Sequence, residues 1–209
     1  MKIETLCENP WLELKKVVDP ENGVNGYVFS HEKRCDGKII SVLPYRIADG
    51  GIQYLLRQEV TPCWGMESVV SSITGGYEGG DILDDVVKEM KEEAGYTITK
   101  DEVIQLGTCF GAKSSDTVYS LYSVDLTGKD QGQAKGDGSE LEAKAHCFWA
   151  PDISKARDPF VYVSFFRIQQ EVLRNIFDDF KRKVVEGSGD IDPKMMNLID
   201  KNFWGLLAG

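Results

Sequence analysis

No stretch of this sequence approaches the roughly 18 consecutive apolar residues of a membrane-spanning helix, and its N-terminus lacks the apolar run of a secretory signal. Positive charge is also scarce, because 24 lysines and arginines face 34 aspartates and glutamates, for a formal net charge of −10. A surface of this sign repels nucleic-acid backbones and anionic membranes. We therefore expect a cytoplasmic protein with no membrane or general nucleic-acid partner, which needs cations if it acts on phosphates.

Residues typical of disulfide frameworks and zinc sites are few and scattered. The five cysteines include no Cys-x-x-Cys pair, and His31 and His146 are the only histidines. A disulfide framework or a zinc knuckle requires clustered ligands at regular spacing. We therefore expect reduced thiols, and a packed or edge position for His146 in place of a ligand role.

The remaining composition is that of a globular α/β protein, with 42% hydrophobic and 28% charged residues. Alternating hydrophobicity and turn residues predict strands over 11–18, 26–30, 38–47, 52–60, 102–110, 117–126 and 143–151, and a further strand that leads into a glycine-rich loop within 66–81. A helical pattern covers 160–187, and a short helix is predicted over 193–207.

The chain contains no internal repeat and no clear linker, which favours a single domain. We expect residues 1–37 to form an N-terminal strand extension, which either extends the main sheet or contacts a partner subunit. Residues 38–209 then form the main domain with its C-terminal helices. The polar, glycine-rich segment 127–140 is predicted to be a flexible loop.

A second helix is predicted over residues 82–96. Ile82, Val86 and Met90 recur every four residues on its apolar side. Asp81 is suited to cap the start of this helix, and Gly95 is a natural residue for its end. The segment is therefore an amphipathic helix that follows directly after the glycine-rich loop.

Three carboxylates lie on one face of this helix, since Glu89, Glu92 and Glu93 stand at positions i, i+3 and i+4. Like charges at such spacing destabilise a helix by roughly 0.2–0.5 kcal/mol per pair. A bound divalent cation reverses this effect, and hard oxygen ligands suit Mg²⁺ or Mn²⁺. Glutamate-rich faces that are simply solvated are also common, so the residues that flank the helix decide between the two interpretations.

Taken together, GGYEGGDILDDVVKEMKEEAGY (75–96) resembles the signature of the Nudix hydrolases. That signature is a glycine, five residues, a glutamate, seven residues, then Arg-Glu-aliphatic-x-Glu-Glu-x-Gly-aliphatic. Its second half matches in register, with Lys88 in the place of the arginine. The first half is about two residues shorter than the family pattern, and Asp81 stands near the position of the loop glutamate.

The resemblance implies a Nudix α/β/α sandwich with a mixed β-sheet, extra N-terminal strands and C-terminal helices. It implies that Glu89, Glu92 and Glu93, with the carbonyl of Gly75, bind Mg²⁺ or Mn²⁺. Glu93 is then a catalytic glutamate, and Lys88 takes the part of the arginine that orients it. Such metals neutralise the charge of a diphosphate and lower the pKa of a bound water.

The wider layout resembles the ADP-ribose and nucleoside-diphosphate-sugar pyrophosphatases. This resemblance implies a small nucleotide-diphosphate substrate, a substrate-binding role for Arg57, and a homodimer. It also implies a general base in the loop before residue 143, where Glu140 is the first choice and Glu142 an alternative. Glu78, in the glycine-rich loop, is a further candidate. Gly111 stands where that subfamily usually has a proline, so the substrate within the family stays open.

Two other functions remain possible from the sequence. A catalytically weak Nudix module that binds a nucleotide or a protein partner would account for the shortened loop and for Lys88. A diphosphate isomerase of the same fold would need a catalytic cysteine, for which Cys63 and Cys109 are available without a supporting motif.

Overall fold

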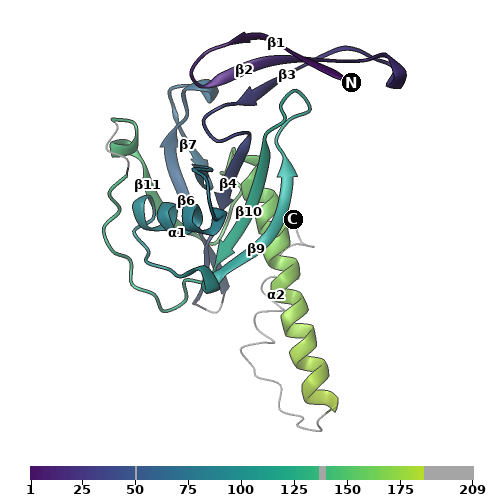
Figure 1. Ribbon diagram of the computed structural model, residues 1–209. Helices are drawn as coiled ribbons and strands as arrows, with labels where there is room; N and C mark the ends of the chain where they lie inside the picture. The colour runs from purple at the N-terminus through teal and green to yellow at the C-terminus, as the bar shows by residue number, and fades with distance from the viewer. Residues whose placement is uncertain (50, 137–139, 186–209) are drawn as a thin grey trace.

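The computed structural model describes residues 1–49, 51–136 and 140–185 (Figure 1). Its body is a mixed α/β fold, as the sequence predicts. The strands of the body are β4 (Lys38–Val42), β5 (Tyr45–Ala48), β6 (Gly51–Val60), β7 (Ser68–Ser71), β8 (Ile73–Gly76), β9 (Val103–Phe110), β10 (Val118–Val124) and β11 (His146–Ala150). The helices are α1 (Ile82–Glu92) and α2 (Pro159–Val185), and short 3-10 turns cover Pro20–Asn22, Pro62–Trp64, Lys100–Glu102 and Glu142–Lys144.

Two sheets form the body. One has the strand order β8-β4-β10-β9, in which β4 and β10 are parallel and the other pairs are antiparallel. The other has the order β11-β6-β5, with β7 paired to β6, and is antiparallel throughout. Predicted strand 38–47 is divided between the two sheets, because Pro44 has no backbone N–H to continue a ladder.

The core consists of two clusters on opposite sides of β6. Leu55 belongs to a cluster with Val86 and Met90 of α1, whereas Tyr54 and Leu56 belong to a cluster that includes side chains of α2. This division follows from the strand, because successive side chains point to opposite faces. The sheets therefore lie between the two helices (Figure 1), and β6 is buried on both of its faces.

The N-terminal strands form a sheet of their own, β1 (Lys2–Glu8), β2 (Leu12–Asp19) and β3 (Val24–Glu32), at one end of the body (Figure 1). It does not extend the main sheet, which was one of the two expectations, and β1 was not expected. Its contacts with the body include a bridge between Ser30 and Ser115 and an ion pair of 2.9 Å between His31 Nδ1 and Asp116 Oδ2.

Asp81 caps α1 as predicted, and Gly95 follows its end, but the helix ends at Glu92 and is four residues shorter than the predicted 82–96. The Asp81 side chain accepts a hydrogen bond from the backbone N–H of Leu83, and Gly95 adopts a φ of 75° just after the helix. α2 agrees closely with the predicted helix over 160–187. The helix expected over 193–207 lies outside the described residues. No helix in the described ranges is long and apolar enough to cross a membrane.

Residues 127–136 differ from the flexible loop that the sequence predicts, because they are bonded to the C-terminal end of α1. The backbone N–H of Gly132 donates to Gly95 O at 2.8 Å, and those of Lys135 and Gly136 each donate to Glu92 O at 2.9 Å. The Gln131 side chain donates to Ala94 O at 2.9 Å. Carbonyls at a helix end have no partner within the helix, so this segment satisfies groups that would otherwise need water.

We predict that Gly95→Ala lowers the free energy of unfolding by about 2–5 kcal/mol, compared with about 1–2 kcal/mol for Gly128→Ala. Both glycines have a φ of 75°, so both variants carry the same backbone strain. A Cβ on Gly95 would also lie 2.5 Å from Gly132 O, whereas a Cβ on Gly128 meets nothing within 4 Å. Urea unfolding of the two variants measures the difference. Equal losses would show that residues 127–136 do not pack against the helix end.

Candidate functional site

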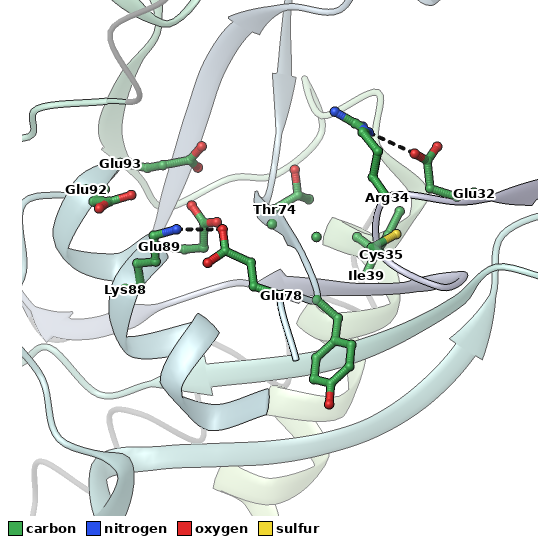
Figure 2. A pocket seen from close by; sticks show the side chains of 13 residues that line it. Glu32, Arg34, Cys35, Ile39, Thr74, Glu78, Lys88, Glu89, Glu92 and Glu93 are labelled. Atoms are coloured by element: carbon green, nitrogen blue, oxygen red, sulfur yellow. Dashed lines mark hydrogen bonds and ion pairs between the residues drawn. The ribbon is translucent and has the colours of Figure 1, made fainter. Parts of the chain in front are cut away.

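A pocket of about 580 Å³ opens beside the C-terminal half of α1 (Figure 2). Its size is in the range of small-molecule sites. One wall is the helix, a second is the strand β8 with the glycine-rich segment after it, and a third is the end of β3 with the turn into β4. The residues that line it are Glu32, Arg34, Cys35, Ile39, Thr74, Gly75, Gly76, Tyr77, Glu78, Lys88, Glu89, Glu92 and Glu93.

Six residues that the sequence singles out lie in this pocket: Gly75, Glu78, Lys88, Glu89, Glu92 and Glu93. The helical spacing brings the glutamates to one side of α1. Pairing of β8 with β4 brings the glycine segment alongside the same wall. The structure therefore assembles the two halves of the Nudix-like segment around one cavity.

Glu89 is a half-buried carboxylate of the pocket with a raised pKa. Its pKa is raised to about 7, mainly by burial; the charge of Lys88 opposes the rise, and the charges of Glu92 and Glu78 add to it. Gly75 makes this position available, because a Cβ there would lie 2.6 Å from both Cγ and Cδ of Glu89. The absence of a side chain at Gly75 is thus what allows Glu89 to lie against the backbone of β8.

Glu93 is held by an arginine from the sheet. Arg57, on β6, is only 2% exposed, and its Nη1 lies 2.8 Å from Glu93 Oε2. Its Nε donates to Glu59 Oε2 at 2.9 Å. Arg57 is not among the residues that line the pocket, and its substrate-binding role stays a prediction. Its ion pair with Glu93 orients that carboxylate.

Lys88 contacts Glu78 of the glycine segment, and its orienting role stays a prediction. Its Nζ lies 2.6 Å from Glu78 Oε1, between α1 and the glycine segment (Figure 2). The hydrogen bond to Glu78, and then its charge, raises the pKa of Lys88. Lys88 therefore joins the helix to the glycine segment, while the contact with Glu93 comes from Arg57.

Of the two candidate bases before β11, the structure describes the side chain of Glu140. Glu140 is exposed and does not line the cavity. Glu142 begins a 3-10 turn, and its side chain is not among those described. Glu78, the third candidate, does line the cavity. The catalytic role of Glu140 stays a prediction.

The donor set suits a hard divalent cation, since the pocket presents carboxylates and the backbone of Gly75. In the described residues, however, no group of three or more histidine, cysteine, aspartate or glutamate side chains is placed to hold a metal ion. Two of the pocket carboxylates have basic partners, because Glu93 pairs with Arg57 and Glu78 pairs with Lys88. A cation therefore fits the pocket by the chemistry of its donors.

Sequence reasoning missed the third wall of the pocket, which contains Glu32, Arg34 and Cys35. No motif marks these residues. The one available signal was their place just before strand β4, whose Ile39 pairs with Gly76 of the glycine segment. Because these three residues come just before β4 in the sequence, they lie at the cavity.

We predict that Gly75→Ala weakens Mn²⁺ binding about tenfold or more, because the new Cβ displaces Glu89 and small displacements at a ligand are costly. Glu89 is flexible, so the free energy of unfolding should change little. Gly51→Ala, at a strand position with nothing within 4 Å, is the matched control. Isothermal titration with Mn²⁺ measures the affinity. Unchanged binding in Gly75→Ala would exclude Glu89 as a ligand.

Comparison with solved structures identifies the fold of this chain. No family model matches the chain, and no curated protein matches it. Among solved structures, it is similar to one described as an ADP compounds hydrolase, with a TM-score of 0.60 and 14% sequence identity. The match covers 84% of this chain and 94% of that one. The chain therefore shares its mixed α/β fold with a hydrolase of ADP compounds.

Proposed function

We propose that this protein is a Nudix hydrolase, which uses Mg²⁺ or Mn²⁺ to cleave a diphosphate linkage in a nucleoside-diphosphate derivative. ADP-ribose or a nucleotide sugar is the favoured substrate. The observation that carries the proposal is the pocket wall formed by Gly75, Glu89, Glu92 and Glu93. The four residues match the Nudix pattern and lie on a fold shared with an ADP compounds hydrolase.

In this proposal Glu89, Glu92, Glu93 and the Gly75 carbonyl hold the cation. When bound, the metal neutralises the diphosphate charge and lowers the pKa of the attacking water. The protein's net charge of −10 makes such neutralisation necessary for a polyanionic substrate. Arg57 fixes the orientation of Glu93, and Lys88 keeps Glu78 at the pocket.

The proton of the water goes to a carboxylate, as general base catalysis requires. Glu140 remains the first candidate by its resemblance to the loop glutamate of the subfamily. Its exposed position means that the loop must bring it to the substrate. Glu78 is the alternative that already lies in the pocket wall.

We predict that the purified protein hydrolyses one class in a panel of ADP-ribose, nucleotide sugars, dinucleoside polyphosphates and nucleoside triphosphates, with Mg²⁺ or Mn²⁺. Glu93→Gln should lower kcat by about 10²–10⁴-fold, because it removes a charged group at the reacting centre. Glu171→Gln, on the exposed part of α2, is the matched control and should keep full activity. Phosphate release and chromatography of the products measure the rates.

The competing hypothesis is a catalytically weak module that binds a nucleotide or a protein partner. Binding of these nucleotides without turnover by the wild type would favour that module. Turnover that Glu93→Gln leaves intact would instead contradict the assignment of the site.

We also propose that the protein forms a homodimer through its N-terminal sheet. This sheet and its turns carry many of the exposed large apolar side chains: Ile3, Leu6, Trp11, Leu12, Leu14, Tyr27 and Val28. A small sheet with this many exposed large apolar side chains is a candidate interaction surface.

A dimer of this kind should be sensitive to charge on the N-terminal sheet. Leu12→Lys is expected to shift the protein toward monomer in sedimentation velocity. Ile47→Lys, at a comparable exposure of 42% against 43% for Leu12, should leave the dimer intact. A monomeric wild type at tens of micromolar, a range where weak dimers still assemble, would contradict the proposal.

A further inference from the structure

The turn that joins β3 to β4 places a cation on the pocket wall opposite the glutamates. Arg34 and Glu32 line the cavity on the side away from α1 (Figure 2). Both precede residue 38, so they belong to the N-terminal extension and not to the Nudix-like segment. The extension therefore contributes to the pocket as well as to the exposed sheet.

This turn is closely fixed by its backbone. The N–H of Gly37 donates to Glu32 O at 2.8 Å, and that of Lys38 donates to Cys35 O at 2.9 Å. Cys35 is buried, and Asp36 adopts a φ of 51°, which few residues other than glycine adopt. A fixed turn with an unusual backbone conformation holds Arg34 at a defined place beside the cavity.

The guanidinium of Arg34 has donors to spare. Its Nε donates to Glu32 Oε1 at 2.9 Å, and its side chain is 67% exposed. Arginine carries five N–H donors, so the single bond to Glu32 leaves the terminal nitrogens for other acceptors. Figure 2 shows this end of Arg34 directed away from Glu32. The contact with Glu32 thus orients the guanidinium of Arg34 without occupying its two terminal nitrogens.

The pocket is strongly acidic, so a phosphate group in it needs a positive charge nearby. Five glutamates line the cavity, and its other described cation, Lys88, is paired with Glu78 at 2.6 Å. A metal held by the glutamates would neutralise part of the charge of a diphosphate, and the remaining charge would lie in an acidic cavity. A guanidinium fork binds phosphate oxygens in pairs, with a geometry that lysine lacks.

We infer that Arg34 binds the second phosphate of the substrate, on the side of the pocket opposite Glu89. This inference rests on the proposed diphosphate hydrolase function and adds a residue to it. The site then recognises an organic diphosphate at two points, the α1 glutamates with their cation and Arg34. An organic monophosphate engages only the first.

The test compares the binding of two probes in the presence of Mg²⁺: the α,β-methylene analogue of ADP, which cannot be cleaved at its diphosphate, and AMP. Arg34→Gln should weaken binding of the methylene analogue about tenfold to hundredfold and that of AMP less than threefold. Arg34→Lys should recover part of the loss. In turnover of the substrate identified by the panel, Arg34→Gln should raise KM and change kcat little.

Arg174→Gln is the matched control. Arg174 has the same side-chain exposure of 67% and a single glutamate partner, Glu171, at 3.1 Å, but it lies on α2 away from the pocket. Its substitution should leave the affinity for both probes unchanged.

Two results would overturn the inference while the proposed function stands. One is a wild type that hydrolyses diphosphates beside an Arg34→Gln variant that binds the methylene analogue equally well. The other is an equal loss of affinity for both probes, which would show that Arg34 does not distinguish a second phosphate. A wild type that neither binds the analogue nor cleaves any diphosphate would overturn the proposed function itself.

Discussion

The pair of Arg57 and Glu93 joins the last turn of α1 to the central strand of the body. Acidic side chains at a helix C-terminus are unfavourable, because the carbonyl end of the helix is already negative. Glu89, Glu92 and Glu93 are all at that end. Arg57 offsets part of this cost at 2.8 Å, and breaking a buried pair of this kind typically costs about 3–5 kcal/mol. The site therefore depends on a buried β6 beneath the helix.

The elements near the site were largely predictable from local patterns. The period of four in Ile82, Val86 and Met90, with Asp81 before it, is sufficient to define α1. Alternating hydrophobicity defined most strands, and the glutamate spacing with the glycine segment defined one wall of the pocket. These features depend on residues that are close in sequence, for which periodicity and capping carry the information.

The features that the sequence did not reveal depend on contacts between distant segments. Burial of Arg57 follows from the position of β6 between two helix layers, which its own residues do not specify. Residues 127–136 are polar and glycine-rich, yet their backbone N–H groups bind the end of α1, and backbone donors leave no trace in composition. Arg34 reaches the cavity only because β4 pairs with the strand that carries the glycine segment.

The central claim is that the glutamates of α1 and the Gly75 carbonyl form one cation site for a diphosphate substrate. The most direct measurement is anomalous diffraction at the manganese edge from crystals grown with Mn²⁺ and the methylene analogue of ADP. The account predicts an anomalous peak within ligand distance, about 2.0–2.6 Å, of carboxylate oxygens of Glu89, Glu92 or Glu93. Ordered analogue in the pocket without such a peak, or manganese bound only elsewhere, would contradict it.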